Sequence, residues 1–561
     1  MGYWDTPPMD RKQARLFSPT LDSAIPPDHP VRLFDEILSK LDWAPWEARY
    51  PHTVGRPPIP PQVMAAVILY GMSVGIRSSR RLEEACLVRL DFMWLASGRD
   101  IDHSTLCAFR KAFGQELKDT FRQIGRVAIN LGLMRLNRLG LDGTRERANS
   151  SRHATATAKT LAERVAALDE QIEAMFAAAE AEERQDQDLF GDSTPHKLPP
   201  ELAELKRRQE RLQKALDKAR ALDAKRGVQA EGAGPADSQG QEPKPADAPG
   251  EGQAQAEGKG KDKDKKKPRP AKVPVADPDA AVMPNKEGGY APNYTPSAAV
   301  DDERGYIADA DVDDRPTEGQ ATVATVDRIE ERFGQKPQEV VADGAYADGQ
   351  ELAGLEARGI QPYVPVTTAE GDGKDNPAVR PDPTQPVPPE AWDRLPRSSK
   401  GKRRPTLDRS AFIYDEAHDC FYCPTGRKLE RKDSQNSPRA DGGVVRVDRY
   451  QCQGCEGCPL GADCRQGHSP RCVQVDEYEP VRRRVSAATK STAGQEAYKR
   501  RCWICETPFA FIKAWIGLRQ FLLRGLEKVK IEWLWTCTAY NLRKLVADVQ
   551  RMRVKFAAML V

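Results

Sequence analysis

The sequence has neither an excess of one charge nor a long apolar run. Its 561 residues carry 86 Lys and Arg against 83 Asp and Glu, so the formal net charge is only +3. Any nucleic-acid partner would therefore be held by local basic patches. No stretch approaches the roughly 20 apolar residues of a membrane helix, and the polar start MGYWDTPPMDRKQ has no apolar signal core. We expect a cytoplasmic protein with no membrane partner.

Cysteine is also scarce outside one region. Of the 12 cysteines, seven lie between Cys420 and Cys472. In a cytosolic protein such a group is more typical of thiols or metal ligands than of disulfides. The length allows roughly three to five folding units.

Composition and periodicity divide the chain into six segments of a mixed α/β protein. We predict a helical N-terminal DNA-binding domain (1–136), the first strand of a sheet core (137–150), an insertion with a helical hairpin and a disordered linker (151–275), the continued core (276–366), a Pro-rich and cysteine-rich insertion (367–490), and C-terminal helices (491–561).

The N-terminal segment reads as short helices. The apolar run 62–70 follows Pro60 and Pro61, and proline is favoured at a helix start. Residues 79–95 continue with apolar side chains on one face. The cations between these helices resemble those of a helix-turn-helix DNA-binding bundle; they include Arg80, Arg81 and Arg110. The alternative, which composition alone favours, is a helical domain with ordinary surface charge.

The first insertion changes character twice. Leu161, Val165, Leu168, Ile172 and Met175 form a heptad seam, and residues 202–219 repeat it after a break with several prolines. An αα-hairpin fits this pattern. Residues 227–274 are low-complexity and have no apolar period, so we expect them to be disordered.

The core segments alternate between strand and helix patterns. We expect a hairpin from 296–301 and 305–312, a helix over 320–333, a strand over 339–342, a helix over 350–358 and a strand over 360–366.

Two carboxylates sit at the ends of short apolar strands. Asp142 follows LGL and Asp343 follows VVA, and functional groups gather at strand ends in open α/β sheets. If the strands are neighbours, the two acids would repel unless cations bind between them. Mg²⁺ or Mn²⁺ prefers such oxygen ligands, and two ions 3.5–4 Å apart can clamp a phosphodiester during displacement.

A helical segment near the C-terminus supplies the candidate third ligand, Glu506. Lys513 follows two turns later on the same face and could reach phosphate, with Tyr498 and Arg501 nearby. Each feature is weak alone, because a Glu–Lys pair on a helix is usually surface decoration and a strand-end Asp is usually a cap.

The combination resembles the bacterial insertion-sequence DDE transposases. The segments that carry the resemblance are GRPPIPPQVMAAVILYGMSVGIRSSRRLEEAC, DFMWLASGRDIDHSTLCAFRKAF, DGTRERANSSR, NKEGGYAPNYTPSAAVDDERGYIADADV, ADGAYADGQEL, and ETPFAFIK with the helix after it. The resemblance implies an RNase H-like mixed-sheet core and Asp142, Asp343 and Glu506 as ligands of two Mg²⁺ ions. Tyr346 and the Tyr498, Arg501 and Lys513 group match auxiliary positions.

Two departures concern the Glu segment. Related elements often place an Arg four positions before the Glu, where this chain has Cys502, so Arg501 or Lys499 would have to substitute. Pro508 should disturb the helix just after Glu506.

The cysteine region predicts a structural zinc site in a zinc-ribbon-like insertion. Cys420-x-x-Cys423 and Cys452-x-x-Cys455 could supply four thiolates. Which of Cys452, Cys455, Cys458 and Cys464 pair is open, and His418 and His468 are possible substitutes. The alternative is a cluster of free or redox-active thiols. We assign no metal to Cys502-x-x-Cys505, whose apolar neighbours favour packing.

The family resemblance implies a DNA transposase. It would cleave double-stranded DNA at terminal inverted repeats, join the ends to target DNA, and act as a homodimer on paired ends. The alternatives are a catalytically inactive DNA-binding relic and a stand-alone metal-dependent nuclease. We interpret the C-terminal aromatic residues as core rather than base-stacking platforms; they are Trp515, Phe521, Trp533, Trp535 and Tyr540.

Overall fold

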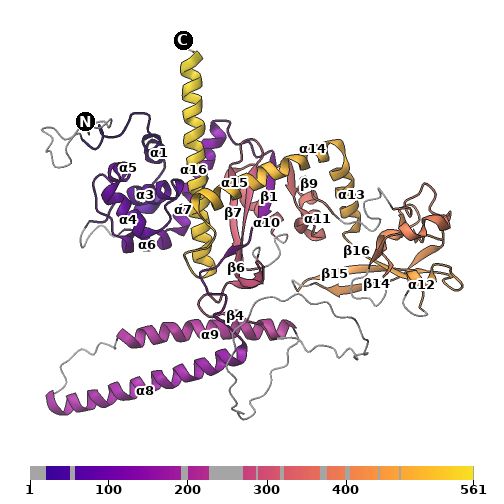
Figure 1. The fold of residues 1–561 in the computed structure, drawn as a ribbon, viewed down its shortest axis with the longest axis horizontal. Helices are drawn as coiled ribbons and strands as arrows, with labels where there is room; N and C mark the ends of the chain where they lie inside the picture. The colour runs from indigo at the N-terminus through magenta and orange to yellow at the C-terminus, as the bar shows by residue number, and fades with distance from the viewer. Residues whose placement is uncertain are drawn as a thin grey trace, which may run out of the picture. The chain divides into compact units, whose positions relative to one another are not determined.

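The computed structural model describes residues 20–50, 57–190, 200–226, 270–285, 288–315, 321–366, 376–398, 405–439, 442–465 and 469–559. The protein is mixed α/β with several sheets (Figure 1). Two compact units divide it, one made of Met1–Glu146, Thr295–Arg519 and Glu527–Val561, the other of Arg147–Tyr294 and Gln520–Leu526. Within the described ranges, no helix has both the length and the apolar character needed to cross a bilayer. The six-segment division stays a prediction.

Short helices form the N-terminal part of the first unit. They are α1 (Pro30–Ser39), α2 (Ala44–Glu47), α3 (Pro61–Ser73), α4 (Ser79–Val88), α5 (Leu90–Leu95), α6 (His103–Ala112) and α7 (Gly114–Asn130). Helix α3 starts at a proline, as expected, and most of its residues are buried. The pattern over 79–95 is two helices instead of one, because Arg89 between them has an extended backbone.

The C-terminal helix α16 (Leu526–Met559) packs against these short helices. The rings of Trp46 and Trp535 are in contact, and the Trp535 indole donates a hydrogen bond to the Arg110 carbonyl. Arg77 forms an ion pair of 2.7 Å with Glu532, whose side chain is fully buried. The prediction that the C-terminal aromatics are core residues is confirmed for Phe521, Trp533, Trp535 and Tyr540, but the Trp515 side chain is 51% exposed.

The sheet core of the first unit follows the expected order. Its strands are β1 (Arg138–Gly143), β6 (Tyr290–Asp301), β7 (Ile307–Asp313), β8 (Glu339–Ala342) and β9 (Gln361–Tyr363), and helices α10 (Thr322–Phe333) and α11 (Gly349–Ala357) connect β7 to β8 and β8 to β9. They lie in the order β7–β6–β1–β8–β9. The strands β6–β1 and β6–β7 pair antiparallel, whereas β1–β8 and β8–β9 pair parallel.

The predicted hairpin, helices and inner strand of this core are confirmed, but the last strand is shorter than 360–366. It occupies the edge of the sheet and contains Pro362, with Pro365 just beyond it. Proline has no N–H to donate to a ladder, so it is confined to edge strands and limits their length.

The second unit contains the predicted αα-hairpin. Helices α8 (Ala158–Phe190) and α9 (Pro200–Arg226) lie side by side (Figure 1), and Leu161, Leu168, Leu212 and Leu216 are buried between them. Strands β3 (Thr155–Ala156), β4 (Val273–Pro274) and β5 (Ala281–Pro284) complete this unit. Most of the segment predicted to be disordered, 227–274, lies outside the described residues. Its last residues were predicted wrongly, because β4 pairs with β3.

The cysteine-rich region of the first unit forms an antiparallel sheet of its own. Its strands are β12 (Ile413–Asp415), β13 (Cys420–Tyr422), β14 (Lys428–Pro438), β15 (Val444–Cys452) and β16 (Cys472–Asp476), in that order. Small elements lie around it: η2 (Pro389–Arg394), β10 (Arg397–Ser398), β11 (Thr406–Leu407), η3 (Arg409–Ala411) and α12 (Gly461–Cys464). One face of the sheet covers a small apolar core that includes Phe421, Leu429 and Tyr450.

The buried Arg77–Glu532 ion pair generates the first prediction. We expect Arg77→Ala to destabilise the protein by about 3–5 kcal/mol, because it removes the cation that is ion-paired with the buried Glu532 carboxylate. Arg80→Ala, which alters an exposed arginine of α4, should change stability by no more than about 0.5 kcal/mol. Urea unfolding followed by tryptophan fluorescence compares the two variants. Equal effects would contradict a structural role for Arg77.

Candidate functional site

Strand pairing brings Asp142 and Asp343 together. Strands β1 and β8 are parallel neighbours whose last paired residues are Leu141 and Ala342. Asp142 and Asp343 are the next residues along the chain. The two carboxylates therefore occupy equivalent positions at the same edge of the sheet, as the sequence predicts for functional groups at strand ends.

Arg501 lies between the two carboxylates. Its Nη2 is 3.6 Å from Asp142 Oδ1 and 3.5 Å from Asp343 Oδ2. The Arg501 side chain is 15% exposed, against 17% for Asp142 and 37% for Asp343. Burial alone would lower the pKa of Arg501, but the charges of Asp142 and Asp343 outweigh it and raise the pKa. One guanidinium thus offsets part of the repulsion between the two carboxylates.

The segment that carries Arg501 and Glu506 is helical but irregular. It consists of α14 (Thr492–Arg501), the π-helix η4 (Cys502–Glu506), α15 (Thr507–Phe511) and a second π-helix, η5 (Ile512–Ile516). The η4 turn packs directly on β1, since a Cβ added at Gly140 would lie 2.7 Å from both Cys505 Sγ and Ile504 Cγ2. Pro508 stands in the first turn of α15, where proline is tolerated.

The π-helix accounts for the spacing that departs from related elements. Arg501 precedes Glu506 by five residues, and a π-turn closes its hydrogen bonds from i to i+5 instead of i to i+4. The π-turn therefore accommodates the additional residue. Arg501 takes the role of the arginine that related elements place four positions before the Glu, where this chain has Cys502. Such π-segments are found frequently at functional sites.

Glu506 itself is exposed. The carboxylate oxygens of Asp142, Asp343 and Glu506 do not all lie within 4.8 Å of one another. Arg501 joins Asp142 and Asp343, but the three predicted acids do not form one cluster. Glu506 directly follows Cys505. The pKa of the Cys505 thiol is raised to about 12, first by burial and then by the charge of Asp142.

Lys513 follows Glu506 along the chain and contacts residues just after Asp142. Its Nζ is 2.9 Å from Glu146 Oε1 and donates a hydrogen bond to Thr144 Oγ1. Glu146 and Thr144 are each 5% exposed. Sequence reasoning predicted phosphate as the partner of Lys513 and missed Glu146, although both partners belong to the DGTRE motif that begins at Asp142. The lysine thus ties the Glu506 segment to the loop after β1.

The two predicted tyrosines, Tyr498 and Tyr346, differ in their surroundings and in their exposure. Tyr498 packs near Val341 and Tyr363 and lies on α14 with Arg501, so it is close to the acidic site. Tyr346 follows Asp343 but is only 5% exposed and lines a small internal cavity. The structure does not place its side chain where DNA could reach it.

The predicted DNA-contacting arginines divide in the same way. Arg80 and Arg81 are exposed at the start of α4. Arg110 is 4% exposed and donates to the Arg77 carbonyl. Its predicted role in DNA contact needs correction, because α6 turns this side chain into the core between the short helices and α16.

The predicted zinc ligands also need correction. Cys420 begins β13 and is next to Phe421, which is in the apolar core under the sheet. Since successive strand residues point to opposite faces, the Cys420 side chain belongs to the other face. Cys423 and Cys452 belong to the apolar core under the sheet, with Cys455, Cys458 and Cys464 packed against it. Cys420 is not part of that core. His418 pairs with Asp415 and is 69% exposed, while His468 lies outside the described residues.

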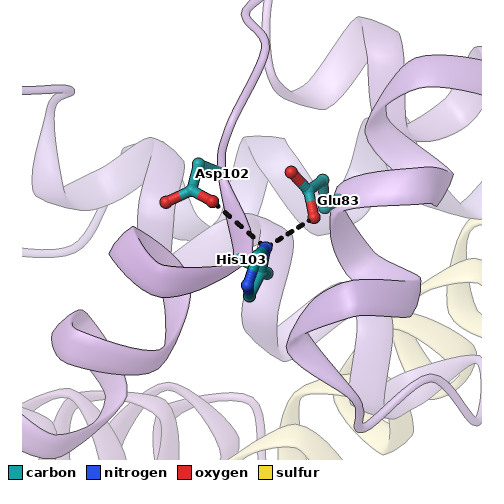
Figure 2. A group of neighbouring side chains, drawn as sticks. All are labelled: Glu83, Asp102 and His103. Atoms are coloured by element: carbon teal, nitrogen blue, oxygen red, sulfur yellow. Dashed lines mark hydrogen bonds and ion pairs between the residues drawn. The ribbon is translucent and has the colours of Figure 1, made fainter.

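One other group of possible metal ligands stands out among the described residues (Figure 2). His103 Nδ1 is 2.8 Å from Glu83 Oε2 and 3.1 Å from Asp102 Oδ1. Asp102 also accepts hydrogen bonds from the backbone N–H groups of Ser104 and Thr105, which makes it the N-cap of α6. Helix capping and an exposed pair between α4 and α6 explain this group without a metal ion.

Two family models match the sequence. One is described as a transposase DDE domain and covers residues 422–546, and the other is described as a transposase domain (DUF772) and covers residues 19–112. Together, the two matches indicate an insertion-sequence DDE transposase. A comparison with curated proteins finds no significant match.

The two matches cover different parts of the transposase. The DDE-domain match includes Arg501, Glu506 and Lys513, and the second match covers the short helices from α1 to α6. Neither includes Asp142 or Asp343. The case for these two acids therefore depends on their position in the sheet and on Arg501.

The Lys513–Glu146 pair generates a prediction about the transposase site. We expect Lys513→Met to lower stability by about 3–5 kcal/mol, because Glu146 would remain buried without its cation. Lys499→Met, on the exposed surface of α14, serves as the matched control and should have little effect. Thermal unfolding of both variants measures the difference. A stable Lys513→Met protein would show that this contact does not hold the segment in place.

Proposed function

We propose that this transposase cleaves double-stranded DNA at the ends of its insertion sequence and transfers the ends to target DNA in a divalent-metal-dependent reaction. The observation that carries the proposal is the pairing of Asp142 and Asp343 around the Arg501 guanidinium. Two acids on neighbouring parallel strands, neutralised by a displaceable cation, are suited to bind divalent ions.

The sheet supports an RNase H-like core. The strand order β7–β6–β1–β8–β9, with an antiparallel β7–β6–β1 half and a parallel β1–β8–β9 half, is the arrangement that we expect for such a core. The first acid ends the central strand and the second ends its parallel neighbour. The proposed core thus places both acids at one edge.

The donor set fits a hard divalent cation. Carboxylate oxygens are the ligands that Mg²⁺ and Mn²⁺ prefer, and the Arg501 guanidinium already occupies the position of a positive charge between them. Asp142 and Asp343 would hold the metal, with Glu506 as the third carboxylate. Two such ions would activate water or a 3′ hydroxyl and stabilise the leaving oxygen in phosphodiester displacement.

The other residues of the proposed site would position the Glu506 segment or contact DNA. Gly140 lets η4 approach β1, and Lys513 holds the loop after Asp142, so that the segment carrying Glu506 stays packed against the strand that carries Asp142. Arg501 would turn from the carboxylates toward the DNA phosphate once metal replaces it. The exposed Arg80 and Arg81 would contribute to DNA binding, and paired element ends would be held by a homodimer.

Substitution of the acids tests the proposal. We expect Asp142→Asn, Asp343→Asn and Glu506→Gln each to reduce cleavage of end-bearing DNA by more than roughly 100-fold, since even outer-shell partners of metal ligands are worth 10–100-fold. End binding should persist. Glu496→Gln, an exposed acid of α14, is the matched control and should retain activity.

The same assay separates the alternatives. Wild-type protein that binds ends but cuts nothing with Mg²⁺ or Mn²⁺ would indicate an inactive relic. Cleavage without joined products would indicate a nuclease. Full cleavage by any of the three acid variants would contradict the assigned site.

The position of Arg501 yields a separate prediction on metal binding. We expect Arg501→Ala to raise the Mg²⁺-induced increase in Tm by about 2–4 °C over that of wild type, the shift expected per kcal/mol in a unit of this size. Without the guanidinium, the two carboxylates repel until the ion binds, so the ion gains more.

Thermal unfolding with and without Mg²⁺ measures this effect. Arg500→Ala is the control, because Arg500 pairs with Asp302 instead and its loss should leave the Mg²⁺ response unchanged. A smaller Mg²⁺ response in Arg501→Ala than in wild type would show that the arginine does not compete with the metal.

A further inference from the structure

Five of the seven clustered cysteines gather on one side of the cysteine-rich sheet. Cys423 follows β13 and Cys452 ends β15, and both are buried in the core under the sheet. The other three of the five, Cys455, Cys458 and Cys464, pack against the same core from the loop and helix α12 that follow β15.

The two remaining cysteines face away. Cys420 precedes the core residue Phe421, and Cys472 precedes the core residue Val473. Since neighbouring residues of a strand alternate between faces, both thiols belong to the opposite side of the sheet. Sequence spacing pairs Cys420 with Cys423, but the strand separates them.

Three of the five thiols are linked by hydrogen bonds, and the other two lie nearby. Cys423 and Cys452 share a side-chain hydrogen bond, and Cys452 shares another with Cys455. Cys464 lies close enough to Cys423, Cys455 and Cys458 to interact with each electrostatically. Cys423 Sγ also accepts a hydrogen bond of 3.3 Å from the Arg427 N–H, an interaction that stabilises a thiolate.

The loop after β15 is built to turn each cysteine toward the others. Gly454 and Gly457 immediately precede Cys455 and Cys458, with φ of 84° and 62°. These left-handed conformations are disfavoured for residues with a Cβ. The repeated Cys-x-Gly-Cys pattern therefore reverses the chain twice and brings successive thiols to the same side.

We propose that Cys423, Cys452, Cys455, Cys458 and Cys464 form a structural zinc site, in which four of the five thiolates bind one Zn²⁺. Zinc takes four sulfur ligands at about 2.3 Å in a tetrahedron, so the sulfurs would lie about 3.8 Å apart. Among the described residues, no three of these sulfurs all lie within 4.8 Å of one another. In any such set of three, at least one sulfur–sulfur distance would have to shorten by about 1 Å or more on binding, through loop movement.

This metal would stabilise a part of the fold that has little apolar core of its own. The loop between β15 and β16 contributes Leu460 to that core. Its polar contacts with neighbouring elements include the Arg397–Asp463 ion pair and a hydrogen bond from Arg427 to the Gly454 carbonyl. Because the free energy of binding structural zinc adds to folding, the ion would secure this loop and the strand β16 that leads to α13 (Glu479–Lys490) and α14. The site is separate from the acids and does not depend on the proposed reaction.

Metal analysis of the full-length chain tests the site. We expect about one zinc per chain after purification without added metal, as for a four-coordinate structural site. Single Cys→Ser changes at four of the five positions should lose most of the zinc. The matched controls Cys420→Ser and Cys472→Ser, from the same segment but the opposite face, should retain it.

A second measurement covers variants that fail to fold. Titration of wild-type thiols with an organomercurial should release zinc, detected by a chromogenic chelator, in step with thiol modification. Co²⁺ substituted for zinc should show the absorption of a tetrahedral thiolate site. A folded protein without zinc, an iron–sulfur chromophore, or zinc loss in Cys472→Ser equal to that in Cys455→Ser would overturn the proposal.

Discussion

The candidate active site depends on two cations that tie one irregular helix to the end of a sheet. Arg501 contacts both Asp142 and Asp343, and Lys513 contacts Glu146 in the loop after β1. Glu506 lies between these two anchors along the chain. Since all these contacts join segments far apart in the sequence, the position of the third acid is set by long-range electrostatics and by the close approach of η4 to Gly140.

The two anchors differ in what they permit. Glu146 is buried, so its pair with Lys513 is costly to break and holds the segment permanently. The carboxylates that Arg501 contacts are more exposed, and Asp343 more than Asp142. An ion with higher charge can replace the guanidinium there. The same helix thus combines a fixed attachment with an exchangeable one, which suits a site that binds metal and DNA in sequence.

Charged residues that sequence reasoning assigns to DNA turn out to have internal partners. Arg110 is buried between the short helices and α16, and Lys513 reaches a buried glutamate. The local sequence pattern predicts that each of these cations lies on a helix, but it does not show which other segments pack over the side chain. Arg80 and Arg81 have the same local signature and are exposed. Only the packing of the C-terminal helix against the N-terminal helices separates the two groups.

The sequence by itself determined the strand ends that carry Asp142 and Asp343, the helical hairpin, and the family, because these depend on periodicity, turn chemistry and motifs read within short windows. The tertiary structure decided which residues meet. Parallel pairing of β1 with β8 joins the two aspartates, the π-turn brings Arg501 to them in spite of its altered spacing, and the alternation of strand faces removes Cys420 from the thiol cluster. Spacing along a chain specifies neighbours only after the local backbone geometry is known, and that geometry results from packing between distant segments.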